Sequence, residues 1–256
     1  MELTVLGCYS PFPRAGGACP GYLIREEDDY LLLECGSGTL SRLAEFIPIT
    51  KIDNVIISHL HGDHCSDLAI LKYAADYDVR ADARAARSDT TPQSEPPGQG
   101  ITVYSPPQPE EEFRRIAYKE ALFSRPLLPE DTLTLGPFEL SFAETDHPIP
   151  CLAMRIRGAS ATLAYTADTA PSKDVEELAR GADLLLAEAS LPEGCEGFRG
   201  HMTASDAGRM AKGADVARLL LTHFWPEADK ERAALDAANQ VDIPVEAVVE
   251  GRSYLI

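Results

Sequence analysis

Three histidines and one aspartate fall within six residues of the chain, at His59, His61, Asp63 and His64. The cluster follows the apolar run at residues 55–57 and precedes a segment with apolar residues at helical spacing, so it occupies the turn between a buried strand and a helix. Neutral imidazole nitrogen and carboxylate oxygen are ligands that zinc and manganese accept. A purification tag would lie at a terminus, so the cluster predicts a metal site at the end of a core strand.

The spacing within this cluster predicts two metal ions. Side chains two residues apart project to the same side of an extended segment, which places His59 and His61 together. Asp63 and His64 lie in the turn that follows and can face a second ion a few ångströms away. A strand end supplies a rigid platform for both sets.

The chain has six histidines, and the other three each lie at the edge of an expected strand. Taken singly, His147 and His223 would be ordinary core or surface histidines, but beside the first cluster they are placed as further ligands. A two-metal site also needs a bridging carboxylate, and Asp168 follows the expected strand at 162–166. Alone, Asp168 would be interpreted as a helix cap.

Strand-like and helix-like segments intermix along the whole chain, which favours a layered α/β fold in one large domain spanning residues 1–256. Residues 79–100 are polar and carry little β-branched aliphatic character, so we expect a mobile loop there, either functional or simply disordered. Strands are expected at 3–6, 22–24, 30–33, 55–57, 101–104, 132–144, 152–157, 162–166, 184–187 and 217–221, and helices at 39–46, 66–77, 110–122, 172–180 and 203–212.

Composition narrows the functional classes. Lys and Arg number 23 against 41 Asp and Glu, a formal net charge of −18, which disfavours general nucleic-acid binding because such binding depends on basic side chains. No window approaches the roughly 18 apolar residues of a membrane helix, and the chain opens without a signal-peptide pattern. We therefore expect a cytoplasmic protein with no membrane partner and reduced cysteines.

These residues resemble the metallo-β-lactamase fold hydrolases, and within them the ribonuclease Z-like and phosphodiesterase-like branch. The resemblance covers nearly the whole chain. The His59–His64 element is specific, and weaker elements occur in the family's order, at 6–10, 34–38, 147, 168–169, 188–190, 200–203 and 221–224. The resemblance implies a four-layer αβ/βα sandwich in which the metals lie at one edge of two central sheets.

The resemblance also implies roles for single residues. One metal is expected on His59, His61 and His147, the other on Asp63, His64 and His223, with Asp168 as the bridge. A metal-bridging hydroxide would then attack phosphorus or a carbonyl carbon. Zinc is the expected ion, and manganese also suits these ligands.

His201 has no metal to bind in this scheme, so it is the candidate general acid or oxyanion donor, with Glu188 as the residue that orients it. Asp63, His201 and Glu188 are accordingly the candidate catalytic residues. A surface histidine beside a helix is the alternative interpretation of His201. The family resemblance further suggests a homodimer.

Differences from the family pattern narrow the range of expected substrates. Classical β-lactamases of this fold place a different residue at the position of His64 and a cysteine at the second metal, so a β-lactam substrate is not expected. Only twenty residues separate His147 from Asp168, with no basic arm between them, and Phe224 follows His223. Processing of tRNA is therefore disfavoured. Glu34 stands where the family more often has aspartate.

The leading hypothesis is a dinuclear metal-dependent phosphodiesterase acting on small, cyclic or short nucleotide-like phosphodiesters. A second hypothesis keeps the site but assigns it to a thioester, lactone or other carboxylic ester, because the ligands alone do not separate the two chemistries. A third, from another class, is a metal-bound module that holds a small ligand without turnover.

Overall fold

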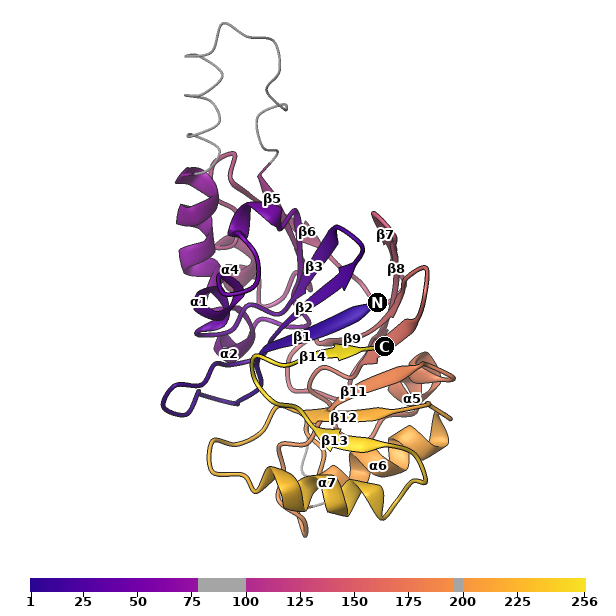
Figure 1. The fold of residues 1–256 in the computed structure, drawn as a ribbon. Coiled ribbons are helices and arrows are strands. Elements are labelled where there is room, and N and C mark those ends of the chain that lie inside the picture. Colours follow the sequence, from indigo (N-terminus) through magenta and orange to yellow (C-terminus); the bar gives the residue numbers. More distant parts are fainter. Residues whose placement is uncertain (78–99, 196–199) are drawn as a thin grey trace, which may run out of the picture.

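The computed structural model describes residues 1–77, 100–195 and 200–256. The loop expected at 79–100 lies outside these residues except for Gly100. Within the described part, the chain forms two seven-stranded sheets that face each other, with helices on their outer sides (Figure 1). This arrangement confirms the predicted four-layer α/β sandwich.

The first sheet has the strand order β14-β1-β2-β3-β4-β5-β6. Its strands from β14 to β3 are antiparallel, and those from β3 to β6 are parallel. The strands are β1 Glu2–Gly7, β2 Gly21–Glu26, β3 Asp29–Leu33, β4 Asn54–Ile56, β5 Ile101–Ser105, β6 Leu122–Pro126 and β14 Ser253–Leu255.

The second sheet repeats this plan with the order β13-β12-β11-β10-β9-β8-β7. Its strands from β7 to β10 are antiparallel, and those from β10 to β13 are parallel. The strands are β7 Thr132–Leu135, β8 Phe138–Glu144, β9 Leu152–Arg157, β10 Thr162–Tyr165, β11 Leu184–Glu188, β12 Leu219–Thr222 and β13 Val245–Ala247.

The strand sequences fit their places in the sandwich. In β2, Tyr22 and Ile24 belong to the core between the sheets, whereas Leu23 belongs to a second core on the outer side of the first sheet. β11 lies between parallel neighbours and all five of its residues are buried, as expected for a strand covered on both faces. β8 instead alternates buried residues with partly or fully exposed ones.

The helices cover the outer faces of the two sheets (Figure 1). α1 and α4 lie with the first sheet, and α5, α6 and α7 with the second. Residues 68–77 are also helical and contribute Leu68 and Leu71 to the outer core of the first sheet. The bounds are α1 Thr39–Leu43, the 3₁₀ turn Ile49–Lys51, α2 Gly62–Cys65, α4 Glu110–Arg114, α5 Lys173–Ala179, α6 Ala204–Gly213 and α7 Lys230–Ala238.

Two expected elements are different in the structure, and two observed elements were not expected. The helix expected over 110–122 ends at Arg114, and Leu122 begins β6, whose partner is β5. The strand expected over 132–144 is a hairpin that turns at Gly136, where φ is +56°. α7 and β14 were not expected from the pattern. Short amphipathic segments of this kind take their structure from the neighbours they pack against.

The parallel strands of both sheets end toward one edge of the sandwich, and the histidine-bearing turns follow them there. β4 leads to His59, β10 to Asp168 and β12 to His223. β8 ends at Glu144, three residues before His147. Among the described residues, no helix is long and apolar enough to span a membrane.

Candidate metal centre

The seven expected ligands come together in space. His64 and His223 are 159 residues apart in the sequence, yet their Nε2 atoms are 3.0 Å apart. They meet because β4 and β12 are inner strands of the two facing sheets, each with a neighbour on both sides, and end at the same edge of the sandwich. Ligands outside the carboxyl ends of strands are typical of layered α/β folds.

The first cluster consists of His59, His61 and His147. His61 Nδ1 lies 3.0 Å from His59 Nε2 and 3.1 Å from His147 Nε2. All three ring nitrogens lie within 4.8 Å of one another near the ends of β4 and β8. This is the set of three residues that the family resemblance implies for one ion.

The second cluster consists of Asp63, His64 and His223. Asp63 Oδ2 lies 3.6 Å from both His64 Nε2 and His223 Nε2. His64 and His223 are buried, and His223 adopts a left-handed backbone conformation with φ +60°. Such conformations in residues other than glycine concentrate at functional sites, where the surrounding structure holds them in place.

Asp168 lies between the two clusters. Its Oδ2 is 3.7 Å from His59 Nε2 on one side. Its Oδ1 is 3.4 Å from His64 Nε2 and 3.2 Å from His223 Nε2 on the other. The two oxygens of this one carboxylate therefore face different clusters, which is the geometry expected of a bridging residue.

The donor atoms fit divalent cations better than they fit one another. Three imidazole nitrogens about 3 Å apart cannot all be satisfied by shared protons, because each N–H can serve only one of the facing lone pairs. Asp168 Oδ1 is buried and has no hydrogen-bond donor within the described residues. A cation at each cluster would satisfy these atoms, and both clusters hold ligand atoms within 4.8 Å of one another.

Electrostatics keep His59 and Asp168 in the forms that bind metals, whereas Asp168 and Glu34 outweigh the effect of burial on His64 and raise its pKa well above its usual value. Burial holds the pKa of His59 well below its usual value, so its imidazole is neutral. Burial alone would raise the pKa of Asp168, but the facing imidazoles of His223 and His64 hold it well below its usual value. Neutral imidazole and ionised carboxylate are the states that a metal requires of these side chains.

Several neighbours orient the ligands, and Glu34 is the one that sequence reasoning left without a role. Its carboxylate lies 3.4 Å from His64 Nδ1 and accepts hydrogen bonds from the Ser58 backbone N–H at 3.2–3.3 Å. Glu34 reaches both because it follows β3, which pairs with β4 in parallel. The signal in the sequence was its place beside the Cys35–Gly36 turn, directly after an apolar run.

Two further supports are backbone and hydroxyl groups. His147 Nδ1 lies 3.0 Å from the Gly200 carbonyl oxygen, which fixes the ring so that Nε2 faces the first cluster. Gly200 has φ +92°, and a Cβ there would lie 3.1 Å from that same ring nitrogen, so only glycine fits. On the other side, the Ser10 hydroxyl donates to Asp63 Oδ2 at 2.9 Å.

His201 and Glu188 form a pair beside the clusters. His201 Nδ1 lies 3.0 Å from Glu188 Oε1, and Glu188 is fully buried and also accepts from the Thr169 backbone N–H. Thr203 begins α6 with a reciprocal capping box, which fixes the chain two residues after His201. Burial lowers the pKa of His201, but the hydrogen bond to Glu188 outweighs it and raises that pKa to about 9.

A cavity of about 700 Å³ opens onto the clusters, and we call it the metal pocket. Its walls include His61, Asp63, Asp168 and His201, together with residues 10–13 on the opposite side. The Phe12 side chain at this wall is 51% exposed. His61 of the first cluster, Asp63 of the second and Asp168 between them all line this one cavity, so a ligand in it can reach both clusters.

Comparison with known proteins places the chain in a class. A family model described as the beta-lactamase superfamily domain matches residues 30–224. The chain therefore belongs to the metallo-β-lactamase superfamily, and it is a metal-dependent hydrolase of that fold. The probable metallo-hydrolase YhfI of Bacillus subtilis is 36% identical to it over 225 residues, which is 88% of this chain and 87% of YhfI.

Solved structures agree with that assignment. The crystal structure of YhfI from Bacillus subtilis aligns with a TM-score of 0.88 at 33% identity, over 99% of this chain and 98% of YhfI. The short form of human tRNase Z aligns with a TM-score of 0.74 at 21% identity, over 100% and 99% of the two chains. A diphosphatase of the PhnP family gives 0.72 at 15%, over 100% and 97%. The last two likenesses concern the fold.

Proposed function

We propose that the protein is a dinuclear metal-dependent phosphodiesterase that acts on small, cyclic or short nucleotide-like phosphodiesters. The observation that carries this proposal is the position of Asp168 between two three-residue clusters, with the His201–Glu188 pair beside it. His201 Nδ1 lies 4.0 Å from Asp168 Oδ2, so the pair borders the same open space as the two clusters.

Each ion has a defined set of protein ligands in this proposal. His59, His61 and His147 hold one ion, and Asp63, His64 and His223 hold the other, with Asp168 joining the two. Zinc suits these ligands, and manganese is the second choice. Two such ions supply Lewis acidity toward phosphoryl oxygens and activate water near neutral pH.

His201 provides the proton for the leaving group. Its Nδ1 is occupied by Glu188, which leaves Nε2 for a substrate in the metal pocket, where the His201 side chain is 29% exposed. Glu188 is itself fixed by the Thr169 backbone N–H at 2.8 Å and by the Ser190 hydroxyl. A proton delivered to the leaving oxygen typically accelerates such a reaction by about 10²–10⁴-fold.

The size and lining of the metal pocket favour a small substrate. A volume of about 700 Å³ is in the usual range for small-molecule sites. The exposed ring of Phe12 offers a surface on which a base could stack. Both clusters face this pocket. This arrangement suits a phosphodiester, because each of the two non-bridging oxygens of the phosphate group can contact one ion.

The test is steady-state hydrolysis of bis(p-nitrophenyl) phosphate by protein loaded separately with zinc and with manganese. His61→Ala serves as the blank, because it removes a shared donor of the first cluster. Lys173→Gln serves as the matched control, since this side chain is 88% exposed and pairs only with Glu176 among the described residues. We expect turnover in the wild type and the control and none in the blank.

Other outcomes would redirect the proposal. Hydrolysis at the same rate by His61→Ala and wild type would overturn it. Turnover of thioesters or lactones but of no phosphodiester would assign the same site to carboxylic ester chemistry. Because tRNase Z shares the fold, a precursor tRNA belongs in the panel, and its selective cleavage would replace the small-substrate assignment.

A further inference from the structure

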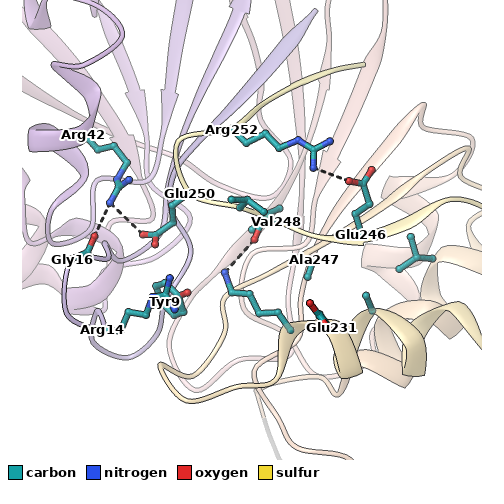
Figure 2. Close-up of a pocket in the computed structure, with 14 residues that line it drawn as sticks. Tyr9, Arg14, Gly16, Arg42, Glu231, Glu246, Ala247, Val248, Glu250 and Arg252 are labelled. Carbon is teal, nitrogen blue, oxygen red and sulfur yellow. Dashed lines mark hydrogen bonds and ion pairs between the residues drawn. The ribbon is translucent and has the colours of Figure 1, made fainter.

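A second cavity of about 810 Å³ lies outside the metal pocket, and we call it the basic pocket (Figure 2). It is bounded by the loop at residues 9–16, by α1, by the start of α7 and by the segment 245–252. Four cationic side chains line it: Arg14, Arg42, Lys230 and Arg252. A cavity with this lining is unexpected in a chain of net charge −18.

The carboxylates in the wall of the basic pocket are largely engaged by two of these cations. Glu250 accepts a hydrogen bond from the Ala18 backbone N–H at 2.7 Å and lies 3.9 Å from Arg42. Glu246 pairs with Arg252 at 3.1 Å and with Arg218. Figure 2 shows these pairs at opposite ends of the cavity. The remaining acid, Glu231, is exposed.

Arg14 and Lys230 have no carboxylate partner within the described residues. The Arg14 guanidinium lies 5.0 Å above the Tyr9 ring, which is a cation–π contact that leaves its N–H groups free for a ligand. Lys230 Nζ lies 3.1 Å from Cys8 Sγ, 3.1 Å from the Val248 carbonyl oxygen and 4.4 Å from the Tyr9 ring centre. Both cations therefore lie against the Tyr9 ring.

Lys230 keeps its positive charge in this position. Burial raises the pKa of the Cys8 thiol to about 11, so its sulfur is a neutral partner. Burial would lower the pKa of Lys230, but contacts with Cys8 and Tyr9 raise it above its usual value. Asp229 caps α7 through the Arg232 backbone N–H, which fixes Lys230 as the first helical residue.

One wall of the basic pocket, next to Lys230, is apolar. It consists of small aliphatic residues from α7 and from the strand β13 and its continuation: Ala234, Val245, Ala247, Val248 and Val249. Such a wall accommodates a flat or compact apolar group, whereas the Arg14 and Lys230 side chains attract an anion. The combination defines a ligand with one anionic end and one apolar end.

We propose that the basic pocket binds a small organic phosphate monoester, with the phosphate at Arg14 and Lys230 and the organic group against the aliphatic wall. Arg and Lys are both typical phosphate ligands, because the first gives directed N–H donors and the second a compact charge. The volume of the cavity is in the range of small-molecule sites. The basic pocket contains none of the proposed metal ligands, so this proposal can be tested independently of the phosphodiesterase proposal.

The experiment is calorimetric titration of the full-length, metal-loaded protein with inorganic phosphate and, separately, with adenosine 5′-monophosphate. Arg14→Gln and Lys230→Met test the basic pocket, and Arg14 is exposed, so its replacement leaves the core intact. Asp168→Asn reports binding at the metal pocket, and Lys173→Gln is the matched surface control. Circular dichroism of each variant checks that the fold is retained.

We expect both basic-pocket variants to weaken binding by about tenfold or more, the usual effect of removing one charged donor from a phosphate. Binding should persist in Asp168→Asn and in Lys173→Gln, and the nucleotide should bind more tightly than phosphate. Binding that disappears in Asp168→Asn but is unchanged in Arg14→Gln would place the anion at the metals and overturn the proposal. So would equal affinity for the two probes, or no binding of either at millimolar concentration.

Discussion

The metal pocket and the basic pocket share one loop but present opposite chemistry. Residues 10–13 of this loop line the metal pocket, whereas Tyr9, Arg14 and Gly16 line the basic pocket. One collects neutral imidazoles and carboxylates that suit cations, and the other collects arginine and lysine that suit an anion. The comparison teaches that a net charge of −18 says little about any single cavity, because local side chains dominate at short range.

The two pockets are also joined through the backbone. Tyr9 and Phe224 form a parallel bridge, in which Phe224 N donates to the Cys8 carbonyl and Ser10 N to the Phe224 carbonyl. Phe224 directly follows His223, and the Ser10 hydroxyl donates to Asp63. The floor of the basic pocket therefore continues into two proposed ligands of the second ion. Variants that affect only one pocket are the way to separate them.

The largest effect is expected from Asp168→Asn. This change keeps the size of the side chain but removes the charge that both clusters share, so neither ion is held as before. We expect phosphodiester hydrolysis to fall below detection and metal content, measured by elemental analysis, to fall with it. A variant that retained two ions and full activity would contradict a bridging role.

The next effect concerns the His201–Glu188 pair. His201→Gln and Glu188→Gln should each lower kcat, by about 10²–10⁴-fold for His201→Gln, because the leaving group then lacks its proton donor. Metal content should stay at the wild-type level in both variants. The effect should shrink for a substrate whose leaving group is already acidic, such as p-nitrophenol, compared with an alkyl leaving group. Equal losses for both leaving groups would argue against general acid catalysis.

Glu34→Gln should have a smaller effect, and on metal affinity in particular. Glu34 orients His64 and the Ser58 backbone, and loss of such a supporting carboxylate typically costs about 10–100-fold in metal affinity. Competition with a chelator of known affinity measures it. The loss should concern one ion of two, since within the described residues Glu34 contacts His64 but neither His61 nor His147.

Ionic strength should change phosphate binding at the basic pocket without changing metal content at the metal pocket, and the effect should be smaller than those above. The cations of the basic pocket are partly open to solvent, so raising salt from about 0.05 M to about 0.5 M should weaken phosphate binding by roughly three- to tenfold. Metal content over the same range should not change, because the proposed ligands are partly or fully buried and would hold the ions by direct coordination. Titration calorimetry and elemental analysis at each salt concentration give both values.

The smallest effect is expected from pH. The pKa of Lys230 in the folded protein is raised above its usual value. Its ammonium group is therefore charged at any pH below the usual value, and it loses its proton only when the pH rises past the raised pKa. Binding of a phosphate monoester should therefore be nearly constant from about pH 7 to about pH 9, where the ligand is also fully ionised. Calorimetry across this pH range measures the binding. A steep loss of binding would show that Lys230 does not hold the ligand.

Much of the fold and of the candidate site follows from the sequence. The apolar run before His59 gives a buried strand, and the runs before Asp168 and His223 give others. Since metal ligands lie at strand ends in such folds, the turns after these strands are expected to meet at one edge of the sheets. The expected helix over 110–122 was wrong after Arg114, because Leu122 forms β6 only by pairing with β5.

The sequence by itself determined the ligand types, their grouping along the chain and the layered fold, because residue type and strand periodicity are local properties. Only the tertiary structure decided that Asp168 directs one oxygen to each cluster and that Glu34 supports His64. It also decided that Arg14 and Lys230, distant in sequence, face one aromatic ring. These relations depend on strand order and on packing across the two sheets, which bring together side chains whose spacing along the chain carries no sign of their contact.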